Sequence, residues 1–89
     1  MIESLSVFFP AYNEEKNLEK TILNAIVVLK KLKIIWEILI INDGSSDKTR
    51  QVADKLAQKY YQVRAFHQQN GGYGTAIRPG LKNAKYEWI

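Results

Sequence analysis

The stretch that decides the fold is Trp36-Glu37-Ile38-Leu39-Ile40-Ile41-Asn42-Asp43-Gly44-Ser45-Ser46. Its first half is rich in β-formers and apolar on both sides of the strand alternation. That pattern is typical of a strand buried on both faces of a parallel sheet. The second half changes at once to polar and glycine residues, which predicts a turn beginning at Asn42. The stretch therefore predicts a buried strand that ends in a polar loop.

Further strands are predicted on both sides of this stretch. Residues 5–9 form a short apolar run, and we expect Pro10 to stop it because the proline ring fixes the backbone as it leaves the strand. Residues 62–67 predict a third strand, and residues 87–89 have the composition of a fourth that has only begun. The sequence thus holds several short segments of strand character, spaced along its whole length.

Helices are predicted between the strands from apolar residues at three- and four-residue spacing. Asn13 can cap the first helix, and Glu14 and Glu15 suit the positive end of its dipole. Ser46 or Asp47 can cap the second helix. The apolar stripes consist of Leu18, Ile22, Ala25, Ile26, Leu29 and Leu32, then Val52, Ala53, Leu56, Ala57 and Tyr60, and finally Ala76, Ile77, Leu81 and Ala84.

This order of elements, β-α-β-α-β-α-β, predicts an α/β fold of three layers with a mainly parallel sheet. Ligands of such folds bind outside the carboxyl ends of the strands. Those ends fall at residues 10–13, 42–46 and 68–74, where polar and glycine residues of the chain gather. The topology therefore predicts one shared ligand site.

Composition narrows the classes of protein. The chain has 89 residues, of which 46 % are hydrophobic, as expected for one small globular domain. A net charge of +4 favours anionic partners such as nucleotides. The absence of cysteine excludes disulfides, zinc–thiolate sites and thiol catalysis. Neither a signal peptide nor a membrane span is predicted, so we expect a cytoplasmic protein.

The first two loops carry side chains suited to a nucleoside. Tyr12 could pack against a flat base, and Glu14 could accept hydrogen bonds from ribose or base. Asp43 ends a strand and precedes Gly44, so its carboxylate could accept the imide or amide N–H of uracil or guanine. The alternative interpretation is a strand stop, a turn and helix caps without a ligand, and it stays open.

The third loop is rich in glycine. Gly71, Gly72 and Gly74 let backbone N–H groups turn toward an anion, and Arg78 could add a positive charge beside a diphosphate. A flexible strand-to-helix turn is the alternative, and neither the dinucleotide fingerprint nor a P-loop is present. His67 is the single histidine and has no evident cysteine, histidine or acid partner, which favours a structural or solvated role.

Taken together and in order, the three loops resemble the family 2 glycosyltransferases of the GT-A fold. The matching segments are residues 6–15, 37–49 and 70–78, followed by Gly80 and Ala84, and they cover essentially the whole chain. The third loop is similar to that of polyprenyl-phosphate transferases, which include dolichyl-phosphate mannosyltransferases. The resemblance implies that residues 1–89 are the N-terminal, nucleotide-binding part of a Rossmann-like GT-A domain.

The resemblance also implies roles for individual residues. Those that would bind the nucleoside are Pro10, Ala11, Tyr12, Glu14, Asp43 and Gly44, and those near the diphosphate are Gly71, Gly72, Gly74 and Arg78. Asn42 stands where the family commonly has an acid, and Pro79 falls inside the expected third helix. We expect nucleotide binding to tolerate the first departure, since Asp43 is the residue matched to the base.

The whole enzyme would transfer a sugar from a UDP- or GDP-linked donor to an acceptor such as polyprenyl phosphate. Mg²⁺ or Mn²⁺ is expected in it, held by an Asp-x-Asp motif. This sequence lacks that motif and the acceptor half, so the resemblance implies no metal site in this segment and assigns no catalytic residue. We expect the isolated chain to bind nucleotide without turnover.

Other classes of protein stay open beside this interpretation. A non-catalytic nucleotide-binding or interaction module could use the same half-fold. Nucleic acid is not an expected partner, because aromatic and basic residues do not interleave along one face. We expect membrane contact only through segments outside this sequence, which would place a longer protein at the cytoplasmic face of a membrane. Exposed sheet edges would favour a homodimer.

Overall fold

The computed structural model of the chain describes residues 4–69. The elements follow in the order β1 (Ser4–Ala11), α1 (Leu18–Lys31), β2 (Ile35–Asp43), α2 (Thr49–Lys59) and β3 (Val63–Gln68). The predicted alternation of strands and helices is confirmed over this range. The predicted third helix and fourth strand fall on residues outside it.

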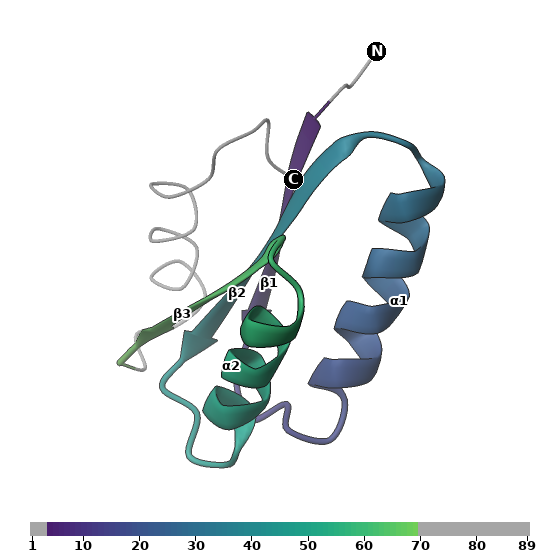
Figure 1. Cartoon of the computed structure of the whole chain (residues 1–89). Helices are drawn as coiled ribbons and strands as arrows, with labels where there is room; N and C mark the ends of the chain where they lie inside the picture. Colours follow the sequence, from purple (N-terminus) through teal and green to yellow (C-terminus); the bar gives the residue numbers. More distant parts are fainter. Residues whose placement is uncertain (1–3, 70–89) are drawn as a thin grey trace.

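The described sheet is parallel, with β2 between β1 and β3 (Figure 1). Every residue of β2 after Ile35 is buried. A strand paired on both sides and covered on both faces has no polar surface to present, so it needs a continuous apolar sequence. The prediction of a strand buried on both faces is therefore confirmed at residues 36–41.

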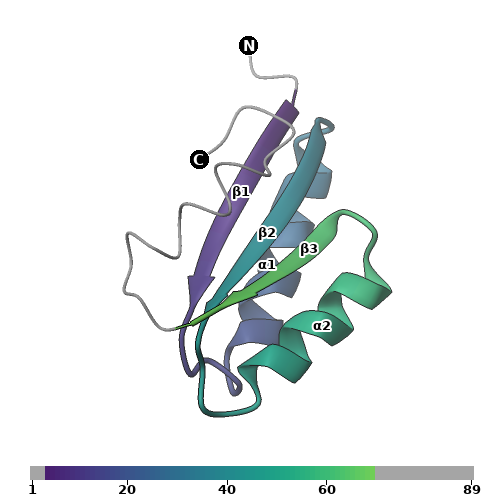
Figure 2. The same cartoon turned by 90° about the vertical axis from the view of Figure 1, so that its left-hand side faces the viewer.

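Both helices lie on the same face of the sheet (Figure 2). With strands in the order β1-β2-β3, two right-handed crossovers must return on one side. The main core lies between this face and the helices and contains Ala11, Leu18, Ile22, Ile26, Leu29, Trp36, Ile38, Ile40, Ala53, Leu56 and Val63. The described residues thus form two of the three predicted layers.

The opposite face of the sheet has an apolar centre. Leu39 and Ile41 are fully buried there, and Phe8 and Phe66 pack against them. The four side chains come from all three described strands. This second cluster explains why β2 has large aliphatic residues on both of its faces, instead of alternating aliphatic and polar residues.

The same face also carries a buried charge. Glu37 is 3 % exposed, and its carboxylate accepts hydrogen bonds from the Ser6 hydroxyl at 2.6 Å and from Arg64 Nη1 at 3.1 Å. The two donors come from the strands on either side of β2. A buried carboxylate is tolerated only with such partners, so Glu37 connects the three strands by side chains as well as by backbone.

Two predicted boundaries of the first strand and helix are wrong. Pro10 does not stop β1, which continues to Ala11 with Pro10 paired in register with Ile41. Proline is tolerated there because β1 lies on the outside of the described sheet. Leu32 is not part of the buried stripe of α1, since it follows the last helical residue and is 54 % exposed.

The predicted cap of the first helix is also wrong. Asn13 does not cap α1, which begins five residues later at Leu18. The chain first makes a turn in which the Leu18 N–H donates to the Glu14 carbonyl at 2.8 Å. Asn13 has a left-handed backbone, with φ of 54°, and its side chain bonds to the loop after β2 instead. The polar side chain therefore serves a contact between loops.

Candidate nucleotide-binding edge

The described strands all end at one edge of the sheet, toward the bottom of Figure 1. The register aligns Ala11 with Asn42 and Asn42 with His67, and the next position pairs Asp43 with Gln68. Successive side chains of a strand point to opposite faces. Asn42 and His67 therefore share the face that the helices cover, and Asp43 and Gln68 share the other.

Hydrogen bonds join the loop after β1 to the loop after β2. The Asn13 N–H donates to Ser45 Oγ at 2.9 Å, and Asn13 Oδ1 accepts from the Ser46 N–H at 2.8 Å. Next to them, the Glu14 N–H donates to Thr49 Oγ1 at 2.7 Å. Each loop satisfies backbone donors of the other, so the two loops form one connected surface.

Asp47 connects the start of α2 to the first loop through hydrogen bonds. Its Oδ1 accepts from the Thr49 N–H at 2.9 Å and from the Thr49 hydroxyl, and its Oδ2 accepts from the Glu15 N–H at 3.3 Å. Burial raises the pKa of Asp47, but the hydrogen bonds from Thr49 and Glu15 outweigh it, so this pKa lies below its usual 3.8. Of the two predicted caps of the second helix, Asp47 is the one that bonds to its first turn.

The lowered pKa of Asp47 makes this contact sensitive to acid. A carboxyl group with a lowered folded-state pKa stabilises the fold above its unfolded pKa and loses that contribution as pH falls through the folded value. Asp47→Asn should therefore lower the urea midpoint of unfolding near neutral pH, and its deficit relative to the parent should shrink below about pH 4. Urea unfolding of the parent and the variant near neutral pH and again below about pH 4 checks this. A deficit that stays constant with pH would contradict it, and Glu19→Gln, at an exposed acid of α1, is the matched control.

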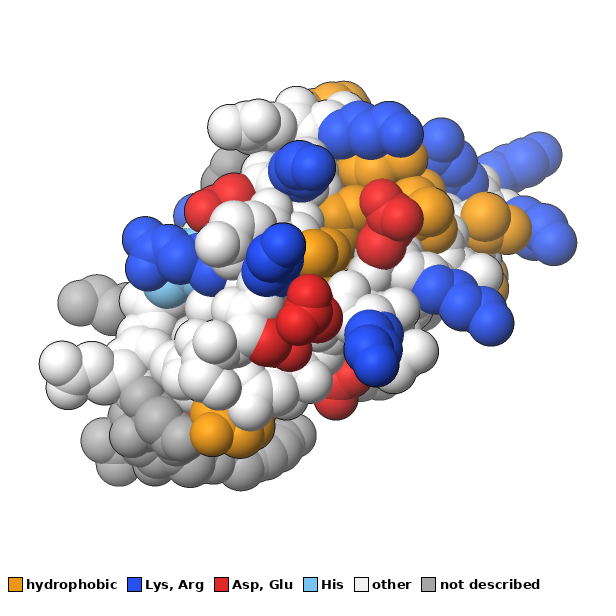
Figure 3. Space-filling view, turned by 90° about the horizontal axis from the view of Figure 1, so that it is seen from below, with side chains coloured by type: hydrophobic (Ala, Val, Ile, Leu, Met, Phe, Trp, Pro, Cys, Tyr) orange, Lys and Arg blue, Asp and Glu red, His pale blue; other side chains and the backbone are white. Residues whose placement is uncertain are grey.

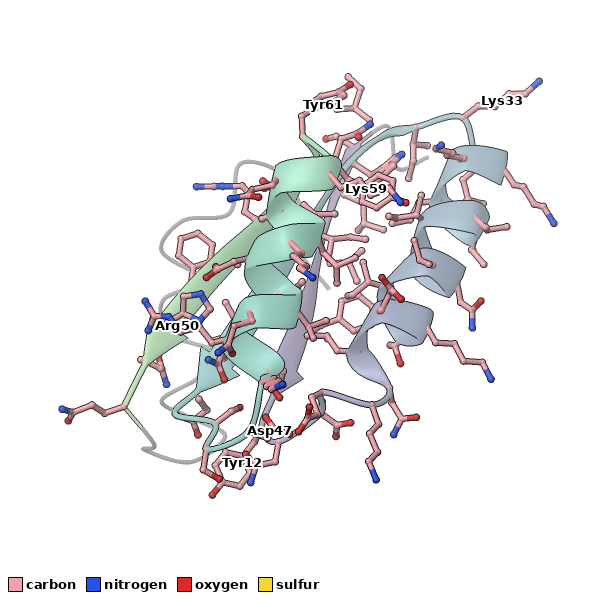
Figure 4. The ribbon with its side chains drawn as sticks, turned by 60° about the horizontal axis from the view of Figure 1, so that its bottom comes forward. Tyr12, Lys33, Asp47, Arg50, Lys59 and Tyr61 are labelled. Atoms are coloured by element: carbon pink, nitrogen blue, oxygen red, sulfur yellow. The ribbon has the colours of Figure 1, made fainter. Side chains whose placement is uncertain are left out.

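The predicted residues of the first loop differ in exposure. Tyr12 is 49 % exposed, Glu14 and Pro10 are exposed as well, and Ala11 is buried in the main core. Within residues 4–69, the side chains of Tyr12 and Glu14 make no hydrogen bond. Figure 4 shows Tyr12 and Asp47 at the end of the molecule where the strands finish. A ligand at this edge would meet the side chain of Tyr12 but only the backbone of Ala11.

The predicted residues of the second loop lie directly after β2. Asp43 is 6 % exposed, and its Oδ1 accepts from Gln68 Nε2 at 3.0 Å. Gly44 is exposed and has φ of 69°, a left-handed conformation that favours glycine. The structure thus brings Tyr12, Glu14, Asp43 and Gly44 to one edge. The remaining predicted residues, Gly71, Gly72, Gly74 and Arg78, lie outside the described range.

A hollow of about 430 Å³ opens beside the second loop. Its lining consists of Asn42, Gly44, Ser45, Arg50, His67, Gln68 and Gln69. Arg50 comes from the first turns of α2 and lies on the β3 side of that helix (Figure 4). Acidic and basic side chains are mixed on the surface seen from below (Figure 3). Among the described residues that line the hollow, Arg50 is the one Lys or Arg.

His67 has two side-chain partners that the sequence does not predict. The imidazole Nδ1 lies 3.0 Å from Asn42 Nδ2, and Nε2 lies 2.7 Å from Asp54 Oδ1. The prediction that His67 has no acid partner is wrong, because Asp54 reaches it across the packing of α2 on β3. The alternation of side chains along each strand could have placed Asn42 and His67 on the face that the helices cover. The register that makes them neighbours has no local signal in the sequence.

The profile described as Glycosyl transferase family 2 matches residues 6–89. The chain belongs to glycosyl transferase family 2. This confirms the resemblance that the three loops suggested, and the described parallel α/β arrangement agrees with the N-terminal half of a Rossmann-like GT-A domain.

Curated relatives from several organisms are similar to this family 2 chain. It is 38 % identical to dolichyl-phosphate beta-glucosyltransferase ALG5A of Trichomonas vaginalis, over 96 % of the chain and 28 % of that protein. It is 33 % identical to the uncharacterized glycosyltransferase EpsJ of Bacillus subtilis, over 100 % of the chain and 25 % of that protein. Identity to the poly-beta-1,6-N-acetyl-D-glucosamine synthase of Staphylococcus aureus is 32 %, over 99 % and 21 %. The chain thus spans about a quarter of the length of these relatives.

Two further properties of this family 2 chain concern metal and membrane. Within residues 4–69, His, Asp and Glu side chains form no group of three or more that could hold a metal ion. In the same range, neither helix is both long enough and apolar enough to cross a membrane. The edge where the described strands end presents the exposed ring of Tyr12 and the polar residues Asn42 and Ser45.

Proposed function

We propose that this chain supplies donor binding to a glycosyltransferase that takes its sugar from a nucleoside diphosphate, with residues 1–89 as the N-terminal nucleotide-binding part. Membership of family 2 supports this. The observation that carries it is the connected edge, where the loops after β1 and β2 are bonded to each other beside Tyr12 and Asp43. A preformed polar edge at the carboxyl ends of parallel strands is where α/β folds bind ligands.

In this proposal each side chain has a separate task. The exposed ring of Tyr12 stacks on the base, and Glu14 accepts a hydrogen bond from the ribose. Asp43, held by Gln68 at the end of the central strand, accepts the N–H of a uracil or guanine. Gly44 lets the ligand approach the backbone closely, because it has no side chain.

The proposed acceptor and metal ion concern parts of the enzyme outside the described edge. The printed name of the relative that is 38 % identical contains dolichyl phosphate, which supports a polyprenyl phosphate as the acceptor. Such an acceptor would place the longer protein at the cytoplasmic face of a membrane. When bound, Mg²⁺ or Mn²⁺ would stabilise the leaving diphosphate. In this proposal residues 4–69 bind the nucleoside, and the metal ion is held by an Asp-x-Asp motif outside this segment.

Asp43→Asn tests the base contact. It keeps the shape of the side chain but replaces a charged acceptor by an amide, and we expect affinity for UDP or GDP to fall about 10- to 100-fold. CDP should bind the parent more weakly than the preferred nucleotide, because cytosine N3 carries no hydrogen for the carboxylate. The variant should discriminate less between CDP and that nucleotide. Calorimetric titration of the 89-residue chain measures these affinities.

The matched control for this test is Glu19→Gln. It removes the same charge from an exposed residue of α1, outside the edge, and should leave the affinities unchanged. Equal affinities of the parent and Asp43→Asn for every nucleotide would contradict the proposed role of Asp43. If the folded parent bound none of the nucleotides, the proposed function of this chain would fail as a whole.

A further inference from the structure

A continuous chain of hydrogen bonds runs from the first loop, through the second, to β3 and α2. The Asn13 N–H donates to Ser45 Oγ at 2.9 Å, and the Ser45 hydroxyl donates to Asn42 Oδ1 at 2.5 Å. Asn42 Nδ2 lies 3.0 Å from His67 Nδ1, and His67 Nε2 lies 2.7 Å from Asp54 Oδ1. We call these five residues, Asn13, Ser45, Asn42, His67 and Asp54, the loop relay.

The direction of these bonds fixes the state of the imidazole. Asn42 Oδ1 already accepts both the hydroxyl and the backbone N–H of Ser45, so the amide nitrogen of Asn42 faces His67. An amide nitrogen can only donate, and His67 Nδ1 must therefore be the unprotonated acceptor. The proton of the neutral ring sits on Nε2 and is donated to Asp54.

We propose that neutral His67 is a positioning residue of the nucleotide-binding edge, and that its protonation disrupts the second loop. A proton on Nδ1 would face the NH₂ group of Asn42, which places two donors against each other. Asn42 must then turn its amide over, and this withdraws the acceptor that holds Ser45. Since Ser45 also holds Asn13, the disturbance reaches the loop after β1.

The location of the relay connects it to ligand binding, and this part of the inference rests on the proposed function. Asn42, Ser45 and His67 all line the hollow beside the second loop, and Asn42 immediately precedes Asp43. His67 is only 16 % exposed in its side chain, so its orientation is set by these partners rather than by solvent. Turning the Asn42 amide would change the wall of the hollow directly beside Asp43.

Two charged side chains of α2 face His67. The carboxylate of Asp54 lies 2.7 Å from Nε2, and Arg50 lines the same hollow. From β2, the side chain on this face is the uncharged Asn42, since Asp43 and Glu37 point to the other face. When the ring that is protonated on Nε2 gains a second proton, Asp54 keeps its donor, whereas Asn42 Nδ2 then faces a second donor at Nδ1.

The relay is tested first without nucleotide, by NMR of the 89-residue chain between about pH 8 and about pH 5, the range in which histidine titrates. The backbone N–H signals of Asn13 and Ser45 and the side-chain NH₂ signals of Asn42 should move with the same midpoint as the His67 ring protons. If the Asn13 and Ser45 signals stay fixed while the ring titrates, the relay is refuted.

Two variants separate positioning from simple structural support. In His67→Asn, the amide oxygen can replace Nδ1 as acceptor and cannot titrate, so the loop signals should stay near their neutral-pH positions throughout. In Asn42→Asp, the carboxylate still accepts from Ser45 and also presents an acceptor to Nδ1, so the Asn13 and Ser45 signals should stay unchanged when the ring gains a second proton. Loop signals of His67→Asn that still follow pH as in the parent would overturn the assignment to His67.

The consequence for binding is measured with whichever of UDP and GDP the parent binds. Between about pH 7.5 and about pH 5.5, the parent should lose about 2- to 10-fold more affinity than His67→Asn. Because both proteins are measured with the same nucleotide, this comparison removes the effect of the nucleotide's own titration. Equal losses in the two proteins would overturn the positioning role. Absence of binding at the higher pH would instead refute the proposed function, while the nucleotide-free spectra still decide the relay.

Discussion

Ile40→Ala is expected to lower the free energy of unfolding by about 2–5 kcal/mol. Ile40 is fully buried at the centre of β2 and belongs to the main core cluster with residues of α1 and α2. Removing three carbons there loses their transfer free energy and leaves a cavity that a strand paired on both sides cannot close. Domains of this size have a stability of about 5–15 kcal/mol, so the change removes a large share of it.

The same strand contains a matched control for this prediction. Ile35→Ala makes the identical chemical change at the first residue of β2, where the side chain is 62 % exposed. We expect it to change the stability by no more than about 0.5 kcal/mol. Urea unfolding of the two variants and the parent gives the comparison. Similar losses for Ile35→Ala and Ile40→Ala would contradict the assignment of the core.

Glu37→Ala is expected to lower the free energy of unfolding by about 2–4 kcal/mol. The substitution deletes the acceptor of both the Ser6 hydroxyl and Arg64 Nη1, and Ser6 is fully buried. Leaving a buried donor and a half-buried cation without this acceptor is far more harmful than the loss of an exposed ion pair. The side chain of Arg64 is 30 % exposed, which limits the effect to the lower part of the range for buried pairs.

A double-mutant cycle isolates the ion pair from the other effects of this substitution. Glu37→Ala, Arg64→Ala and the double variant are compared with the parent by urea unfolding. If the two side chains stabilise each other, the double variant should lose less stability than the sum of the single variants. Additive losses would contradict a coupling between Glu37 and Arg64, and a negligible loss for Glu37→Ala would contradict its buried role.

The elements that could be predicted from the sequence are those with a strong local pattern. The apolar run of β2, the stripe of α1 from Leu18 to Leu29 and the strand-helix order are all confirmed. The position of the candidate site follows from this order, because parallel strands end at one edge. Membership of family 2 follows from three loops in sequence, each of which alone has a simple structural explanation.

What could not be predicted depends on contacts between distant residues. Asn13 has the residue type and position of a helix cap, yet it bonds to Ser46, which lies 33 residues later. Asp54 has no sequence signal as the partner of His67, since only the packing of α2 on β3 brings them together. Glu37 lies within a segment that the sequence predicts as an apolar strand, because its partners, Ser6 and Arg64, come from the neighbouring strands. Polar side chains with several possible partners are assigned by the tertiary register rather than by local sequence.

The central claim is that the joined loops after β1 and β2 are a nucleotide site, and backbone amide NMR tests it most directly. The 89-residue chain is titrated with UDP and with GDP, each with and without Mg²⁺. We predict saturable shifts at residues 11–14, 43–45 and 71–74 with one of the nucleotides. Signals of Lys33 and Tyr61, at the opposite end of the molecule (Figure 4), should stay unchanged. A folded chain with no saturable shift at the first two loops would contradict the claim.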